Sequence, residues 1–170
     1  MAKTKSEANW ARENYKSAME KIQSTKEKFM RRKLIKSLAS IEDSWASEVL
    51  LDSLEERTEE IRDIIVRELG MRKNLNLELV CRKLSHPLWS VKSSALRILG
   101  LQKNPAVLTY IEEMLAEPNA EVRRVLAHTL GDIGGKQALA LLLKLAKDKN
   151  QFVRASAEKA IQQASKLRIT

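Results

Sequence analysis

The chain has 170 residues, of which 44% are apolar and 31% charged, and its formal net charge is +9. With 5 glycines, 3 prolines and 4% aromatic residues, the composition favours helices over strands. One cysteine, Cys81, and two histidines exclude an internal disulfide and leave too few ligands for a metal cage, so we expect no metal and no cofactor.

The sequence predicts no membrane span. The longest nearly uncharged run, residues 138–143, is far shorter than the roughly 20 residues that cross a bilayer. The first residues lead into a charged segment rather than the apolar core of a secretory signal. We therefore expect a cytoplasmic protein.

The charge alternates along the chain. The net charges of consecutive blocks are +7 for residues 1–40, −7 for 41–70, +6 for 71–104, −3 for 105–135 and +6 for 136–170. This alternation argues against a uniform polyanion-binding surface, but it leaves room for a local basic stripe.

Residues 1–40 contain two apolar stripes. They predict a divergent helical cap or first repeat, and a single long charged helix explains the same pattern. A terminal repeat is expected to diverge, because it exposes a face that inner repeats bury. The second stripe consists of Met30, Leu34, Ile35 and Leu38.

From residue 41 onward the sequence repeats every 30 or 31 residues. Marker residues occupy the same position of successive repeats, and a basic residue follows each of them. Mostly apolar residues recur 4, 7 and 8 positions after the marker, as on one side of an amphipathic helix. The markers are Ile61, Val91, Val122 and Val153. The repeats cover about residues 41–72, 73–103, 104–134 and 135–165, and we expect a single domain overall.

Another helix is predicted before each marker helix. The predicted first helices span about residues 45–54, 75–84, 106–115 and 137–146. Asn104 and Pro105 indicate the start of the third, because asparagine caps helices and proline fits the first turn.

A glycine stands nine positions after three of the markers. These residues are Gly70, Gly100 and Gly131. We predict that they end their helices in the left-handed conformation, which glycine adopts without steric cost.

The run from Leu130 to Gly135, with Val122-Arg123 before it and Ala138 after it, resembles a HEAT repeat of the short phycobilin-lyase-like type. The resemblance covers about residues 42–165. It implies an all-α fold, namely a right-handed α-α superhelix (a HEAT or armadillo-like solenoid) of about five helix pairs.

The same resemblance implies a hydrogen-bonded ladder between neighbouring repeats. Its members are an acidic residue in the turn within each pair and the basic residue after the marker. The corresponding residues, six apart, are Glu56 with Arg62, Glu117 with Arg123 and Asp148 with Arg154. The second repeat departs, since it has His86 and Lys92 there. We interpret the three arginines as structural rather than phosphate-binding.

The second helices are expected to line the concave side, where their exposed positions form a candidate binding site. Six positions after the markers stand Arg67, Arg97, His128 and Lys159, and Arg124 lies one turn before His128. We call these five residues the basic stripe. Arg31, Arg32, Lys33 and Lys36 continue it towards the N-terminus. The stripe suits an acidic protein or the phosphates of a nucleic acid, and the plainer alternative is a set of solvated side chains.

No combination of nucleophile, base and oxyanion donor emerges, so no catalytic residue is assigned. We predict a non-enzymatic, monomeric scaffold that binds a protein with an acidic surface and no membrane. Two alternatives stay open: a nucleic-acid binder similar to the HEAT-like alkylpurine DNA glycosylases, and a chromophore lyase or lyase partner. The tryptophans Trp10, Trp45 and Trp89 are interpreted as packing residues, with Trp89 partly exposed.

Overall fold

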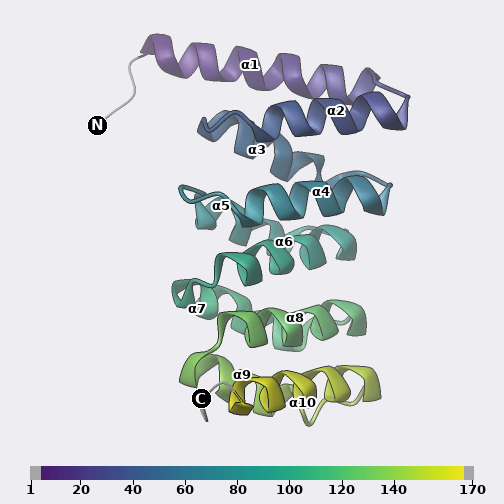
Figure 1. Ribbon diagram of the computed structural model, residues 1–170, viewed down its shortest axis with the longest axis vertical. Coiled ribbons are helices and arrows are strands. Elements are labelled where there is room, and N and C mark those ends of the chain that lie inside the picture. Colours follow the sequence, from purple (N-terminus) through teal and green to yellow (C-terminus); the bar gives the residue numbers. More distant parts are fainter. Residues whose placement is uncertain (1–4, 167–170) are drawn as a thin grey trace. The chain divides into compact units, whose positions relative to one another are not determined.

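The computed structural model describes the backbone of residues 5–166 and the side chains of residues 9–163. This part of the chain consists of α-helices and short 3₁₀ helices without a strand, which confirms the all-α prediction (Figure 1). The chain divides into two compact units, Met1–Leu69 and Gly70–Thr170. Each is described by itself, and the number of independent domains stays a prediction.

The first unit contains two helix pairs. Residues 5–39 form two helices rather than one long one, and the third helix ends in a 3₁₀ turn. The elements are α1 (Lys5–Ser24), α2 (Lys28–Ala39), α3 (Ser44–Asp52), η1 (Ser53–Glu55) and α4 (Glu59–Gly70).

The apolar stripes of these helices form the core of the first unit. Ile35, Leu50 and Ile65 are fully buried. Trp45 is buried too, and the exposed Trp10 packs edge-on against it with 6.2 Å between the ring centroids. Trp45 packs in the core as expected, and Trp89 is half exposed as expected, but the exposure of Trp10 was not predicted.

The second unit contains three helix pairs, in which the first helix is often partly 3₁₀. The first pair is α5 (Leu77–Arg82), η2 (Lys83–Ser85) and α6 (Trp89–Gln102). The second is η3 (Pro105–Val107), α7 (Leu108–Ile111), η4 (Glu112–Ala116) and α8 (Ala120–Ile133), and the third is α9 (Gly135–Leu145) and α10 (Gln151–Lys166).

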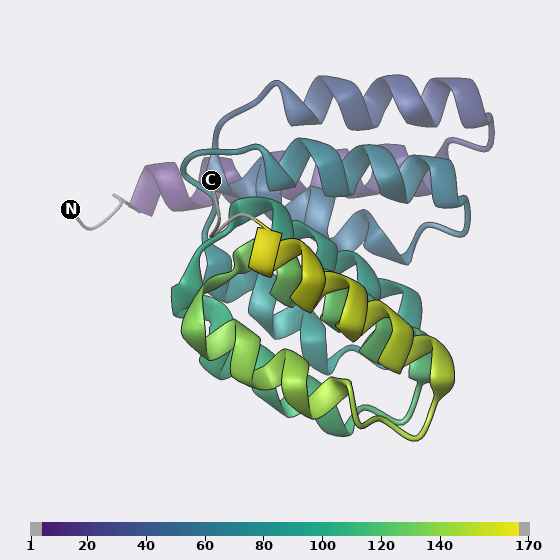
Figure 2. The same ribbon diagram turned by 60° about the horizontal axis from the view of Figure 1, so that its bottom comes forward.

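The second helices of this unit form a row. α8 packs against α6 on one side and α10 on the other, and Figure 1 shows the three helices stacked in chain order. α9 packs against both α8 and α10, and Figure 2 shows α9 and α10 side by side, joined by their turn. Helix pairs that stack in this way are the building plan of a HEAT-type solenoid.

The prediction of left-handed stops at Gly70, Gly100 and Gly131 was wrong. All three lie inside helices, and the residues with positive φ are Lys103, Gly134 and Gly135. Gly131 instead stands where α8 and α10 come close to each other, since a Cβ on this residue would lie 3.0 Å from the Cβ of Ala160 on α10. The glycines therefore let neighbouring second helices approach each other.

The first helix of the pair that contains α8 is not the continuous helix predicted for residues 106–115. Only α7 is α-helical there, with 3₁₀ segments on both sides. Val107, Thr109 and Ile111 place β-branched residues at every second position, which lowers helix propensity. The predicted start is confirmed, because the Asn104 side chain accepts a hydrogen bond from the Ala106 amide and Pro105 is the first residue of the turn.

Candidate functional site

One buried ion pair joins the last two helix pairs. The Arg123 side chain is 4% exposed, and its Nε and Nη2 donate to the two carboxylate oxygens of Asp148 at 2.7 and 2.9 Å. Its Nη1 donates to the main-chain oxygens of Glu117 and Pro118. Such a two-pronged guanidinium contact is geometrically specific as well as strong. The hydrogen bond from Arg123 lowers the pKa of Asp148 below its ordinary value.

Two more contacts have the same spacing of 25 residues. Arg31 Nη1 lies 2.6 Å from Glu56 Oε2 within the first unit, and Lys92 Nζ lies 2.7 Å from Glu117 Oε2 within the second. We call each of these contacts a rung. Each links a basic residue of a second helix to the turn of the next pair: Lys92 and Arg123 follow markers, and Arg31 follows Met30 at the corresponding position of the first pair.

The predicted partners six residues apart meet differently. Arg62, Arg123 and Arg154 each donate to the main-chain oxygen of the turn residue six positions earlier, not to its carboxylate. The carboxylates of Glu56, Glu117 and Asp148 receive the cation of the preceding pair instead. Sequence reasoning missed Arg31 and Lys92 as rung residues, and the 25-residue spacing was the signal that could have found them.

The acidic turn residues also hold the turns that lead into the second helices. Glu56, Glu117 and Asp148 accept hydrogen bonds from the amide two positions later. His86 does the same with Nδ1, which accepts from the Leu88 amide at 3.1 Å. An imidazole nitrogen thus replaces a carboxylate oxygen, which explains how the second repeat keeps the turn without an acid.

The basic stripe is exposed on the second helices. Arg97, His128 and Lys159 occupy equivalent positions on α6, α8 and α10 of the second unit. Arg67 lies on α4 and is also exposed, with its Nη2 3.4 Å from Glu68 Oε1. The second unit therefore brings four of the five predicted residues onto one row of helices, because Arg124 also lies on α8.

Two residues of the basic stripe, Arg124 and His128, offer less positive charge to a partner than two unpaired cations would. Arg124 donates from Nε to Glu121 Oε2 at 2.8 Å and pairs with the other oxygen through Nη2. Its Nη1 lies 3.3 Å from His128 Nε2. Partial burial and the Arg124 cation lower the pKa of His128 below its ordinary value, which favours the neutral imidazole. Lys159 forms no ion pair in the described part of the chain.

Neither a reactive thiol, nor a metal site, nor a membrane helix is found in the part of the chain that the structure describes. Burial, and next the Glu78 carboxylate, raise the pKa of Cys81 to about 11, so its thiol is protonated at neutral pH. Residues 5–166 contain no cluster of three acidic, histidine or cysteine side chains that could hold a metal. No helix in the same range is long and apolar enough for a bilayer.

Comparison with known families finds a match over half of the chain. Residues 77–162 match the family model of HEAT repeats. The matched region contains the Lys92 and Arg123 rungs and the stripe residues Arg97, Arg124, His128 and Lys159. No curated protein matches the chain.

Proposed function

Because the chain belongs to the HEAT-repeat family, we propose that it is a non-enzymatic scaffold that binds another protein along its second helices. HEAT repeats commonly mediate protein interactions. The observation that carries the proposal is the row of α6, α8 and α10, which exposes Arg97, His128 and Lys159 at equivalent positions. The cytoplasmic address and the monomeric state stay predictions.

The charge distribution supports an acidic partner. Residues 70–170 contain 17 Lys and Arg against 8 Asp and Glu, whereas residues 1–69 contain 14 of each. The whole net charge of +9 thus belongs to the second unit. Such a surface attracts acidic partners over a range of about 10 Å at moderate salt.

A protein partner is favoured over a nucleic acid. Arg124 is engaged by Glu121 and Arg123 by Asp148, so neither guanidinium is available for a phosphate without breaking an ion pair. The lowered pKa of His128, which stands between Arg97 and Lys159, further reduces the positive charge of the stripe. The lyase alternative and the short phycobilin-lyase-like subtype are supported by the 31-residue period and the run from Leu130 to Gly135 alone.

The proposal is tested by charge reversal with a matched control. The variant Arg97→Glu with Lys159→Glu changes the stripe, and Lys73→Glu with Lys136→Glu makes the same change in charge on exposed loop and first-helix residues. Each immobilised protein is incubated with native lysate, and the captured proteins are quantified by mass spectrometry. We expect a protein that the wild type and the control retain and the stripe variant loses. Equal capture by all three would refute the proposed surface.

A parallel titration separates the nucleic-acid alternative. Labelled duplex DNA and single-stranded RNA are titrated with protein at about 50 and 200 mM salt, where a phosphate-contacting protein loses affinity steeply. Salt-dependent binding that the stripe variant abolishes and the control preserves would replace the protein partner by a nucleic acid.

A further inference from the structure

We propose that Arg154 is a second binding site, an open rung that holds a carboxylate from an acidic turn of a partner protein. The inference rests on the proposed scaffold function, because it names a contact between this chain and its partner. It concerns α10 at its start, away from the stripe positions of α6 and α8.

Arg154 is held in the same way as Arg123. Its Nη1 donates to the main-chain oxygens of Asp148 at 2.8 Å and Lys149 at 3.1 Å. The Nη1 of Arg123 donates to the oxygens of Glu117 at 2.6 Å and Pro118 at 3.1 Å. Two main-chain acceptors thus fix each guanidinium before any carboxylate arrives, which lowers the entropy cost of binding one.

The two arginines differ in what the rest of the guanidinium does. Arg123 uses Nε and Nη2 to bind both oxygens of Asp148. In the described part of the chain the Nε and Nη2 of Arg154 donate to no acceptor. The partly exposed Arg154 therefore offers the same two donors, Nε and Nη2, that bind a carboxylate in Arg123. By analogy, the ligand that fits Arg154 is a carboxylate.

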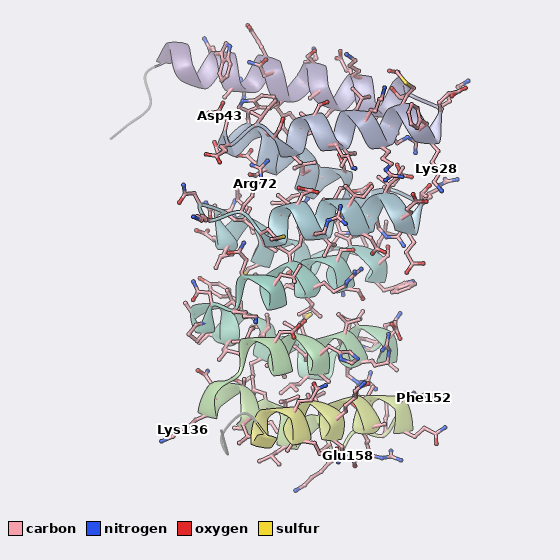
Figure 3. The ribbon with its side chains drawn as sticks, in the orientation of Figure 1. Lys28, Asp43, Arg72, Lys136, Phe152 and Glu158 are labelled. Atoms are coloured by element: carbon pink, nitrogen blue, oxygen red, sulfur yellow. The ribbon has the colours of Figure 1, made fainter. Side chains whose placement is uncertain are left out.

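No acid of α10 fills the site. Glu158 lies one turn after Arg154 on α10, labelled in Figure 3, but it is exposed and forms no ion pair with it. The sequence contains no further acidic residue between Glu158 and Thr170.

The surroundings fit an acidic turn. Lys147 and Lys149 are exposed on either side of Asp148, and residues 136–170 have a net charge of +6. The Phe152 side chain is 64% exposed near Arg154 in sequence and offers apolar contact area. Asp148 itself binds Arg123 from a turn that opens a helix, so the partner segment we infer is an Asp or Glu at the start of a helix.

Stacking of a further similar helix, or of a second copy, fits less well. On α8, Ala127 is buried and Gly131 approaches Ala160 of α10. The equivalent residues of α10 are Glu158 and Gln162, which are exposed and too large for that close approach. In the first pair Thr25 stands where later turns have an acid, so a second copy offers no carboxylate there.

The test observes Arg154 directly. The probe is an acetylated, amidated peptide that copies residues 145–152 and so contains the Asp148 turn, and the matched control peptide has asparagine in place of this aspartate. Both are titrated into the full ¹⁵N-labelled chain while the Arg Nε–H resonances are followed. We expect the Arg154 resonance to shift saturably with the aspartate peptide and not with the asparagine peptide.

Two variants sharpen the result. Arg154→Lys keeps the charge but loses the paired donors, so we expect affinity for the aspartate peptide to fall about tenfold. Glu158→Gln removes a competing negative charge and should strengthen binding. Circular dichroism verifies that each variant is folded.

Three outcomes would overturn the inference: no Arg154 shift at millimolar peptide, equal shifts with both peptides, or unchanged affinity in Arg154→Lys. The Arg97→Glu, Lys159→Glu variant separates this failure from that of the proposed function. If it loses the captured protein while the peptide leaves Arg154 unmoved, the scaffold function stands and the open rung does not.

Discussion

Removing one carboxylate from the ladder should destabilise the protein far more than removing an exposed one. Asp148→Ala deletes two hydrogen bonds from Arg123 and one from the Asn150 amide. The Arg123 side chain, 4% exposed, would keep only its main-chain acceptors. Leaving a buried charge without its partner costs about 3–5 kcal/mol. This is a large part of the roughly 5–15 kcal/mol that stabilises a typical domain.

The same unit provides a matched control. Glu112 and Lys144 also join neighbouring helix pairs, with 2.8 Å between Lys144 Nζ and Glu112 Oε1, but their side chains are 46% and 59% exposed. Glu112→Ala should therefore cost only about 0–1 kcal/mol. The two pairs have nearly the same contact distance, so the difference between the variants reports burial together with the additional hydrogen bonds of Asp148.

The free energy of unfolding is measured by urea titration, followed by circular dichroism at 222 nm. The single variants Asp148→Ala and Arg123→Met and their double variant form a cycle, which yields the coupling between the two side chains. Asp148→Asn keeps an acceptor for the Asn150 amide. It therefore separates the contribution of this turn hydrogen bond, about 1 kcal/mol, from that of the ion pair.

A loss of stability in Asp148→Ala no larger than that in Glu112→Ala would contradict the role of the buried ion pair. A coupling near zero in the cycle would contradict it too, because Arg123 and Asp148 would then contribute independently. A change in the slope of the urea titration would instead indicate that unfolding is no longer a single transition.

Three further results are expected. The lowered pKa of Asp148 contributes stability that is complete above its unfolded pKa of about 4 and is lost as the pH falls through the lower folded value; the stability gap between wild type and Asp148→Asn, measured by urea unfolding, should therefore shrink from pH 7 to pH 3. Gly131→Ala should destabilise by about 1–3 kcal/mol through its clash with Ala160, and Ala160→Gly should restore part of the loss in the same assay. Cys81 should react slowly with a thiol reagent in the native protein and rapidly in urea; equal rates would contradict its burial and raised pKa.

Periodicity predicted the helix pairs because it reports burial, which is what holds the helices together. The column Leu50, Val80, Ile111 and Leu142 is at most 1% exposed, as expected of a core face. The same signal said nothing about hydrogen bonding inside the helix, so the 3₁₀ segments around α7 were missed. Glycine was misread for a related reason: a close neighbour from another repeat is invisible in a local pattern.

The candidate site was predictable in position but not in charge. Arg97, His128 and Lys159 are exposed on equivalent turns because helical spacing determines which side of a helix they occupy. The Glu121 contact that engages Arg124 spans three residues and could have been anticipated from the i, i+3 spacing. The rungs could not be found by pairing residues within a repeat, because each rung joins two repeats.

The two rows of helices in the second unit differ in construction. α6, α8 and α10 are unbroken helices of 14, 14 and 16 residues. In the other row α9 is unbroken with 11 residues, but α5 and α7 have only 6 and 4 residues and continue as 3₁₀ turns. Because 3₁₀ hydrogen bonds are geometrically poorer, strain imposed from outside should be absorbed first at α5 and α7. The row of α6, α8 and α10 should then keep the distances between Arg97, His128 and Lys159 while the first helices deform.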